Sequence, residues 1–169
     1  MVSRLFGMFS RRPVIVHAHC DIPCGIYDPH AAQIAALTVV RMNQLIGEMT
    51  KLGPQSSPEE REAYVHKLSR CTAVKEHHAE QVKHELRIIW GDYFTPDHVK
   101  QYPEAHALAW DIMKLASKAR QEINAQVAQD LLSKTQQFAE IFWKTKGAEV
   151  QRQPSMQKSG GELLYPMKK

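Results

Sequence analysis

The sequence predicts an all-α protein, an antiparallel four-helix bundle over residues 29–147 that follows an irregular segment over residues 19–28. Apolar residues recur at helical spacing in four long segments, and prolines and glycines stand at the ends of those segments. No segment alternates apolar and polar residues for long enough to form a convincing strand. The connections are short, as antiparallel neighbours in a bundle require.

Length and composition suit one globular domain. The 169 residues are 43% hydrophobic and 24% charged. A mean hydropathy of −0.42 and the lack of a long apolar run exclude a spanning helix, so we expect a cytoplasmic protein with no membrane partner. A net charge of +4 is too small for nucleic-acid binding, so we expect no nucleic-acid partner. Three cysteines, an odd number, argue against a secreted disulfide scaffold.

The first two helices have clear ends. Asp28-Pro29 is expected to begin the first and Gly53-Pro54 to close it. Its apolar positions are Ala35, Val39, Met42, Ile46 and Met49. A capping box from Ser57 to Glu60 begins the second helix, and Gly91 ends it. The stripe of the second helix is Tyr64, Leu68, Cys71, Lys75, His78, Val82, Glu85 and Ile89.

The remaining elements follow in order. Thr95-Pro96 is expected to start a single helical turn, and Pro103 to start the third long helix. The apolar face of that helix is Leu108, Ile112, Leu115 and Ala119. The fourth helix is expected over residues 123–146, with Gly147 ending it. Its apolar residues are Val127, Leu131, Phe138 and Phe142. Residues 148–169 lack periodicity and are expected to form a flexible tail.

Residues 1–18 are expected to be a leader that is removed on maturation. They contain three arginines and no acidic residue, and their apolar stretches are too broken for a secretory signal. An organelle transit peptide, which is also rich in arginine and poor in acid, stays open as an alternative.

The segment that does not fit the bundle reads His-Cys-Asp-Ile-Pro-Cys-Gly-Ile-Tyr-Asp-Pro from His19. Pro23 and Gly25 exclude a helix and can turn the chain so that the sulfur of Cys24 approaches Cys20. The segment then offers two thiolates and one imidazole. Cleavage before His19 would add a free amine and the peptide nitrogen of Cys20. Planar nitrogen and sulfur donors favour nickel(II) or copper(II) over tetrahedral zinc.

At these residues the sequence resembles the nickel-containing superoxide dismutase family. The signature of that family, H-C-D-x-P-C-G-x-Y-D-P, is matched at every fixed position from His19 to Pro29. The leader resembles the M-x-S-R-L-F start of the precursors in that family. Three later segments are similar to its W-x-D-Y-F-x-P, K-Y-P-E and I-F-W-x-T-K motifs, namely residues 90–96, 100–104 and 141–146.

The resemblance implies an enzyme that converts two superoxide ions and two protons to oxygen and hydrogen peroxide. One nickel ion per chain would alternate between nickel(II) and nickel(III). His19 would supply its amine and an axial imidazole, Cys20 its amide nitrogen and sulfur, and Cys24 the second sulfur. Thiolate and amidate donors stabilise the higher charge of the metal, whereas zinc has no redox chemistry. The resemblance also implies a homohexamer and a processing peptidase that cuts before His19.

Three further residues are candidate catalytic residues. Tyr27 and Tyr93 match the two active-site tyrosines of the family, whose phenols could order the anion or a water and help deliver protons. Residues 19–28 are called the hook from here on, and Asp21 is expected to hold the hook in place by hydrogen bonds. Some family members orient the axial imidazole with a Glu on the first helix that pairs with an Arg on the second. The corresponding positions here are Ala35 and His78, and His78 is a candidate replacement.

Other functions stay open at this stage. The same hook could serve a nickel or copper carrier, and Cys20 with Cys24 could act as a thiol-disulfide pair. A helical module that only binds partners is the simplest alternative. Cys71, in the middle of a helical stripe, is expected to be a buried thiol. His77, His78 and His84 lack the repeated Glu-x-x-His pattern of a di-iron bundle, so no second metal site is expected.

Overall fold

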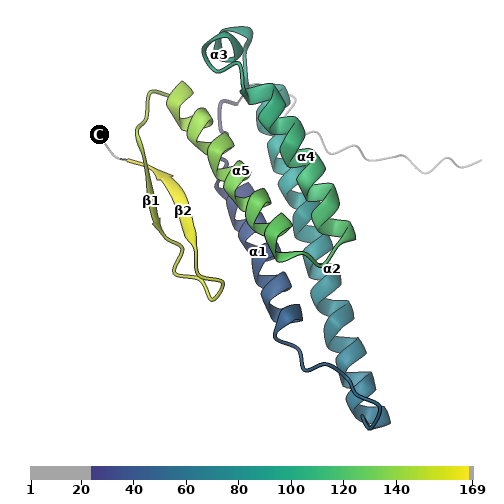
Figure 1. Ribbon diagram of the computed structural model, residues 1–169. Helices are drawn as coiled ribbons and strands as arrows, with labels where there is room; N and C mark the ends of the chain where they lie inside the picture. The colour runs from purple at the N-terminus through teal and green to yellow at the C-terminus, as the bar shows by residue number, and fades with distance from the viewer. Residues whose placement is uncertain (1–23, 168–169) are drawn as a thin grey trace, which may run out of the picture.

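The computed structural model describes residues 24–167, which are mostly helical and carry a small two-stranded sheet (Figure 1). The predicted leader and the hook residues His19, Cys20 and Asp21 lie outside this range. The elements in order are α1 (His30–Gly47), α2 (Pro58–Ile88), a π-helical turn (Ile89–Tyr93), α3 (Pro96–Gln101), α4 (Ala105–Gln121), α5 (Ala125–Thr145), β1 (Val150–Pro154) and β2 (Glu162–Pro166). The prediction of a mostly helical protein is confirmed, but the expectation that no segment forms a strand is wrong, because β1 and β2 form a small sheet.

The four long helices share one hydrophobic core. Helix α1 packs against α2 and α5, and α4 packs against the same two helices. Their directions alternate in Figure 1, so the N-terminus of α1 and the C-termini of α2 and α5 lie at one end of the molecule. No helix within residues 24–167 is long and apolar enough to cross a membrane.

The predicted apolar positions match the core closely on α5 and less closely elsewhere. All four predicted residues of α5 are buried, and on α4 Ala116 is buried where Leu115 is only half-buried. On α2 the buried residues are Cys71, Lys75, Ala79, Val82 and Leu86. His78 and Glu85 are only half-buried, because the 3.6-residue period of an α-helix rotates away from a strict heptad stripe. Cys71 is the buried thiol that the sequence predicts.

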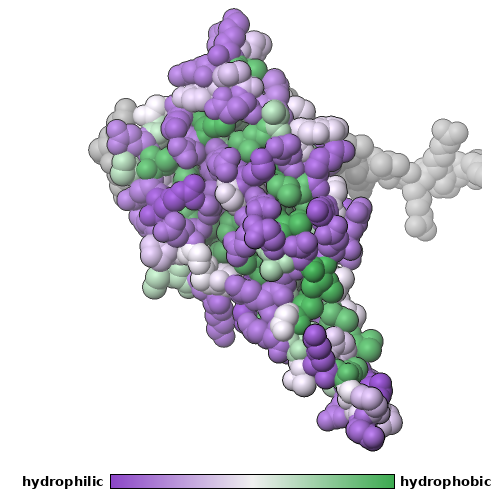
Figure 2. Space-filling view, in the orientation of Figure 1, coloured by the Kyte–Doolittle hydropathy of each residue, from purple (hydrophilic) through white to green (hydrophobic). Residues whose placement is uncertain are grey.

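Helix α2 is longer than its neighbours. It has 31 residues, whereas α1, α4 and α5 have 18, 17 and 21. The predicted capping box starts it: the Ser57 hydroxyl accepts from the Glu60 amide at 3.2 Å, and the Glu60 carboxylate accepts from the Ser57 amide at 2.8 Å. No residue from 58 to 70 is fully buried, and this end projects from the body of the molecule (Figure 1). Its surface is mixed, with hydrophobic patches between hydrophilic residues (Figure 2).

A buried lysine holds the end of α4. Lys75 is 1% exposed, and its ammonium donates to the backbone carbonyls of Ala119, Arg120 (3.2 Å) and Glu122 (2.8 Å). The last carbonyls of a helix have no partner within the helix, and a positive charge there interacts favourably with the negative end of the helix dipole. Burial lowers the pKa of Lys75, although the charges of Glu76 and Glu122 raise it. Lys75 therefore joins α2 to the connection between α4 and α5.

The flexible tail predicted over residues 148–169 is wrong for residues 150–166. This segment forms an antiparallel hairpin in which Arg152 lies opposite Leu164. Leu163 and Leu164 are buried, 1% and 2% exposed. These two buried leucines are adjacent in the sequence, and β1 is almost wholly exposed, so the segment shows no alternating pattern. Its order comes from contacts with the helices.

Candidate functional site

The candidate site lies at the end of the molecule where α1 begins and α2 and α5 finish (Figure 1). Of the predicted metal ligands, only Cys24 lies within the described residues. Its thiol is free and exposed, and the sulfur accepts a hydrogen bond from the Ile26 amide at 3.4 Å. Gly25 has a φ of +71°, a backbone conformation that other residues rarely adopt. The positive φ of Gly25 is compatible with the turn that the sequence predicts here, whose other residues, Cys20 to Pro23, lie outside the described range.

Tyr27 and Tyr93, which are far apart in the sequence, lie together. Their ring centroids are 5.5 Å apart, with an angle of 53° between the planes. Tyr27 is half-buried against the core, and Tyr93 also packs on Phe142 (4.7 Å) and stacks on His98 (5.3 Å). The structure thus brings two of the three candidate catalytic residues to the segment that carries Cys24.

The hydroxyl of Tyr93 is held by Thr145, a residue that the sequence reasoning did not single out. The two hydroxyl oxygens are 2.7 Å apart, and the Thr145 hydroxyl donates to the carbonyl of Phe142 at 2.6 Å. Threonine has only one hydroxyl proton, so in the Tyr93 contact Thr145 accepts and Tyr93 donates. The phenolic oxygen of Tyr93 therefore keeps its lone pairs for a partner in the site. Thr145 lies in the I-F-W-x-T-K motif, which was the available signal.

A positive charge lies over the same aromatic group. The Lys146 ammonium is 5.3 Å from the ring centroid of Tyr93, 4.8 Å from that of Phe142 and 5.7 Å from that of Trp143. Aromatic faces attract cations at these distances, so the rings help to keep the ammonium at this end of the molecule. The sequence reasoning missed this role because it treated the charge of the chain only as a net value.

The two positions where the sequence departs from the family motif lie on neighbouring helices. Ala35 is buried on α1, and His78 is half-buried on α2. The Nδ1 atom of His78 is 2.9 Å from the carbonyl of Val74 and must carry a proton to bond it. Among residues 24–167 no three His, Cys, Asp or Glu side chains form a group that could hold a metal.

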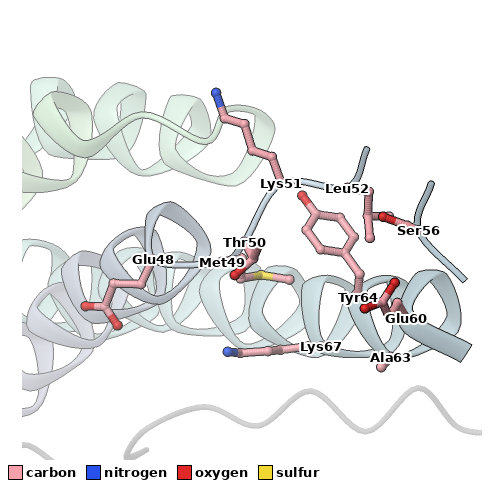
Figure 3. A pocket seen from close by; sticks show the side chains of 10 residues that line it. All are labelled: Glu48, Met49, Thr50, Lys51, Leu52, Ser56, Glu60, Ala63, Tyr64 and Lys67. Atoms are coloured by element: carbon pink, nitrogen blue, oxygen red, sulfur yellow. The ribbon is translucent and has the colours of Figure 1, made fainter. Parts of the chain in front are cut away.

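A pocket of about 430 Å³ lies at the other end of the molecule, between the α1–α2 connection and the first turns of α2 (Figure 3). Tyr64 points into it beside Leu52, and Lys51 and Glu60 are also among its lining residues. None of the candidate ligands lines this pocket, and neither does Tyr27 or Tyr93. The candidate site, with Cys24, Tyr27 and Tyr93, therefore lies at the opposite end of the molecule from this pocket.

An exposed thiol, which can bind a metal, stands three residues before one of two packed tyrosines, and this combination suits a metal-dependent oxidoreductase. The chain belongs to the nickel-containing superoxide dismutase family, whose sequence model matches residues 14–146.

Known proteins similar to this chain agree with that membership. It is 38% identical over 148 residues to the nickel superoxide dismutase of Streptomyces coelicolor, an alignment that covers 88% of this chain and all of that protein. The nickel superoxide dismutase of Streptomyces seoulensis is 37% identical over the same share of both chains. A solved structure of a native nickel superoxide dismutase superposes with a TM-score of 0.64 at 36% identity, covering 76% of this chain and 99% of that one.

Proposed function

We propose that the chain acts as a superoxide dismutase whose nickel ion, one per chain, is held by His19, Cys20 and Cys24 after cleavage before His19. The observation that carries the proposal is the Tyr27–Tyr93 contact at the end from which the Cys24 segment leaves α1. The donors would suit the metal, because two thiolates, an amine and a peptide nitrogen are nitrogen and sulfur donors of the kind that nickel(II) favours. The exposed thiol of Cys24, next to a glycine with a positive φ, is accessible to a metal.

When bound, the nickel ion would supply the one-electron redox chemistry that converts superoxide to oxygen and hydrogen peroxide. The residues of the chain would handle the anion and its protons. The Lys146 ammonium places a positive charge beside the tyrosines, which favours the approach of a small anion. Tyr93 donates its own proton to Thr145, so its oxygen is available to accept a hydrogen bond from a water or from the protonated product.

Tyr27 and Asp21 would complete the site. The ring of Tyr27 packs on Tyr93, so its phenol can act on the same substrate molecule. Asp21 would tie the hook down by hydrogen bonds. The alternatives, a nickel or copper carrier or a thiol-disulfide protein, are not favoured, because the similar proteins are superoxide dismutases.

We extend the proposal to the domain organisation, the assembly and the setting of the enzyme. Helices α1, α2, α4 and α5 would form the antiparallel four-helix bundle expected over residues 29–147, with residues 1–18 removed by a processing peptidase. Six chains would associate as a homohexamer in the cytoplasm. The packing of α1 and α4 against the same two helices supports the bundle. The hexamer, the peptidase and the location rest on the family resemblance and the composition, and sedimentation of the processed protein tests the hexamer.

The test of the site is to make three proteins that begin at Met1, Ala18 and His19 and to load each with nickel. Superoxide consumption per bound nickel should be high only in the protein that begins at His19. In the other two, the nitrogen of His19 is an amide without a basic lone pair, so one donor is lost. Equal activity from the Met1 protein, with its leader shown intact by mass, would rule out the amine as a ligand.

A further inference from the structure

The C-terminal hairpin lies outside the part of the chain that defines the family. The family match ends at residue 146, whereas β1 and β2 occupy residues 150–154 and 162–166. In Figure 1 the hairpin lies beside α1 and α5. Any contribution it makes to the site is therefore a property of this chain rather than of the fold shared by the family.

The hairpin binds α1 through a buried glutamine. The side-chain amide of Gln33 donates to the Leu164 carbonyl at 3.0 Å, and its oxygen accepts from the Leu164 amide at 2.9 Å. Gln33 thus satisfies both backbone groups of a buried β2 residue, as a neighbouring strand would. The backbone amide of Gln33 donates to the Pro29 carbonyl at 3.2 Å, and this hydrogen bond closes the first turn of α1. One residue therefore links β2 to the start of α1.

A second contact lies one turn earlier. The ring of Tyr165 packs on the ring of His30, the first residue of α1, with centroids 5.4 Å apart. The local capping of this turn is weak: Pro29, as N-cap, provides no side-chain hydrogen bond, and the first turn has no acidic residue. The Asp28 carboxylate accepts from the His30 amide at 2.8 Å. The start of α1 thus has one local cap, from Asp28, and two tertiary contacts with the hairpin, through Gln33 and His30.

The other contacts of the hairpin are far from this end. The Gln44 side chain donates to the Ser159 carbonyl at 3.0 Å near the C-terminus of α1. Gln136 on α5 donates to the Glu162 carbonyl at 2.6 Å and accepts from Arg152 at 2.5 Å. The hairpin is therefore attached independently to α5 and to both ends of α1.

We infer that this hairpin is a brace for the metal hook, in which Tyr165 and Gln33 hold the first turn of α1, from which the hook extends. The inference rests on the proposed function, because it assigns the hook its nickel. Cys24 lies only six residues before His30, so movement of that turn would move the thiolate relative to Tyr27 and Tyr93. Gln33 and Tyr165 are positioning residues, since they act through the helix end and not on the substrate.

The test uses Tyr165→Ala, with Tyr165→Phe as the conservative variant and Gln44→Ala as the matched control. Tyr165→Ala removes the ring from His30 but leaves the buried leucines of β2 in place. Gln44→Ala removes a hairpin contact at the other end of α1. The first measurement is hydrogen–deuterium exchange of residues 24–34 in the metal-free full chain. Exchange there should rise about three- to tenfold in Tyr165→Ala, as the loss of one aromatic contact predicts, and stay unchanged in the other two variants.

The second measurement is nickel affinity of the processed proteins, by competition with a chelator. Tyr165→Ala should bind nickel about three- to tenfold more weakly, less than the roughly 10–100-fold typical for direct partners of a ligand. Tyr165→Phe should restore the affinity. Unchanged exchange, or unchanged affinity despite faster exchange, would overturn the brace. A wild-type protein that binds no nickel would instead overturn the proposed function, and the exchange result would still show whether the hairpin holds the helix end.

Discussion

The hydrogen bond from Tyr93 to Thr145 leads to a quantitative prediction about activity. Thr145→Val keeps the size and branching of the side chain but removes the only acceptor identified for the Tyr93 proton within residues 24–167. A hydrogen bond of this kind contributes about 1 kcal/mol net. Losing it lowers the population of the correctly oriented phenol by roughly fivefold, which is what 1 kcal/mol corresponds to at 25 °C. We expect the rate of superoxide consumption per bound nickel to fall by about the same factor.

The assay is stopped-flow measurement of superoxide decay, with thermal unfolding to show that the fold is intact. Thr145→Ser keeps the hydroxyl and should retain activity. Tyr93→Phe removes the group that Thr145 orients, so adding Thr145→Val to it should cause no further loss, and the two changes should not be additive. Full activity in Thr145→Val, or an equal further loss in the Tyr93→Phe background, would refute the argument.

Three further predictions concern the ligand, the core and pH. Cys24→Ser should abolish nickel binding measured by metal analysis while Cys71→Ser retains it, because only the first thiol is exposed beside the site; normal nickel content in Cys24→Ser would contradict the assignment. Lys75→Ala should lower the free energy of unfolding in urea by about 2–4 kcal/mol, since it leaves a cavity and helix-end carbonyls without a donor, and a change too small to measure would show that water replaces the ammonium. Burial raises the pKa of Glu80, but the Arg87 hydrogen bond and the charges of Lys83, Arg87 and Arg120 outweigh it and lower the pKa overall. The unfolded state therefore binds the proton of Glu80 more readily than the folded state does. The stability that this network contributes is complete above about pH 4.3 and is lost as the pH falls through the lower folded pKa. We expect the free energy of unfolding to fall by less than about 1 kcal/mol over this range, and by nothing from this source in Glu80→Gln.

The sequence by itself determined the helices and most of their ends, and it predicted which residues of the hook are donors to the metal. Helix ends depend on local groups, so Ser57 with Glu60, and Gly147 with its φ of +67°, were readable from the order of residues. The family motif from His19 to Pro29 is likewise continuous in the sequence, and so are the motifs that contain Tyr93 and Lys146. Local chemistry and short-range periodicity therefore predicted where the helices lie and which residues are candidates for the metal.

Only the tertiary structure decided which distant residues act together. The hairpin is stable because Gln33 satisfies the backbone of Leu164, a pairing between residues more than a hundred positions apart that no local pattern encodes. Lys75 stood in an apolar stripe without an explanation until the carbonyls at the end of α4 were seen around its ammonium. Thr145 became a site residue because the fold placed its hydroxyl against that of Tyr93. In each case a polar group is satisfied across the fold, and buried polar groups must find their partners wherever packing brings them.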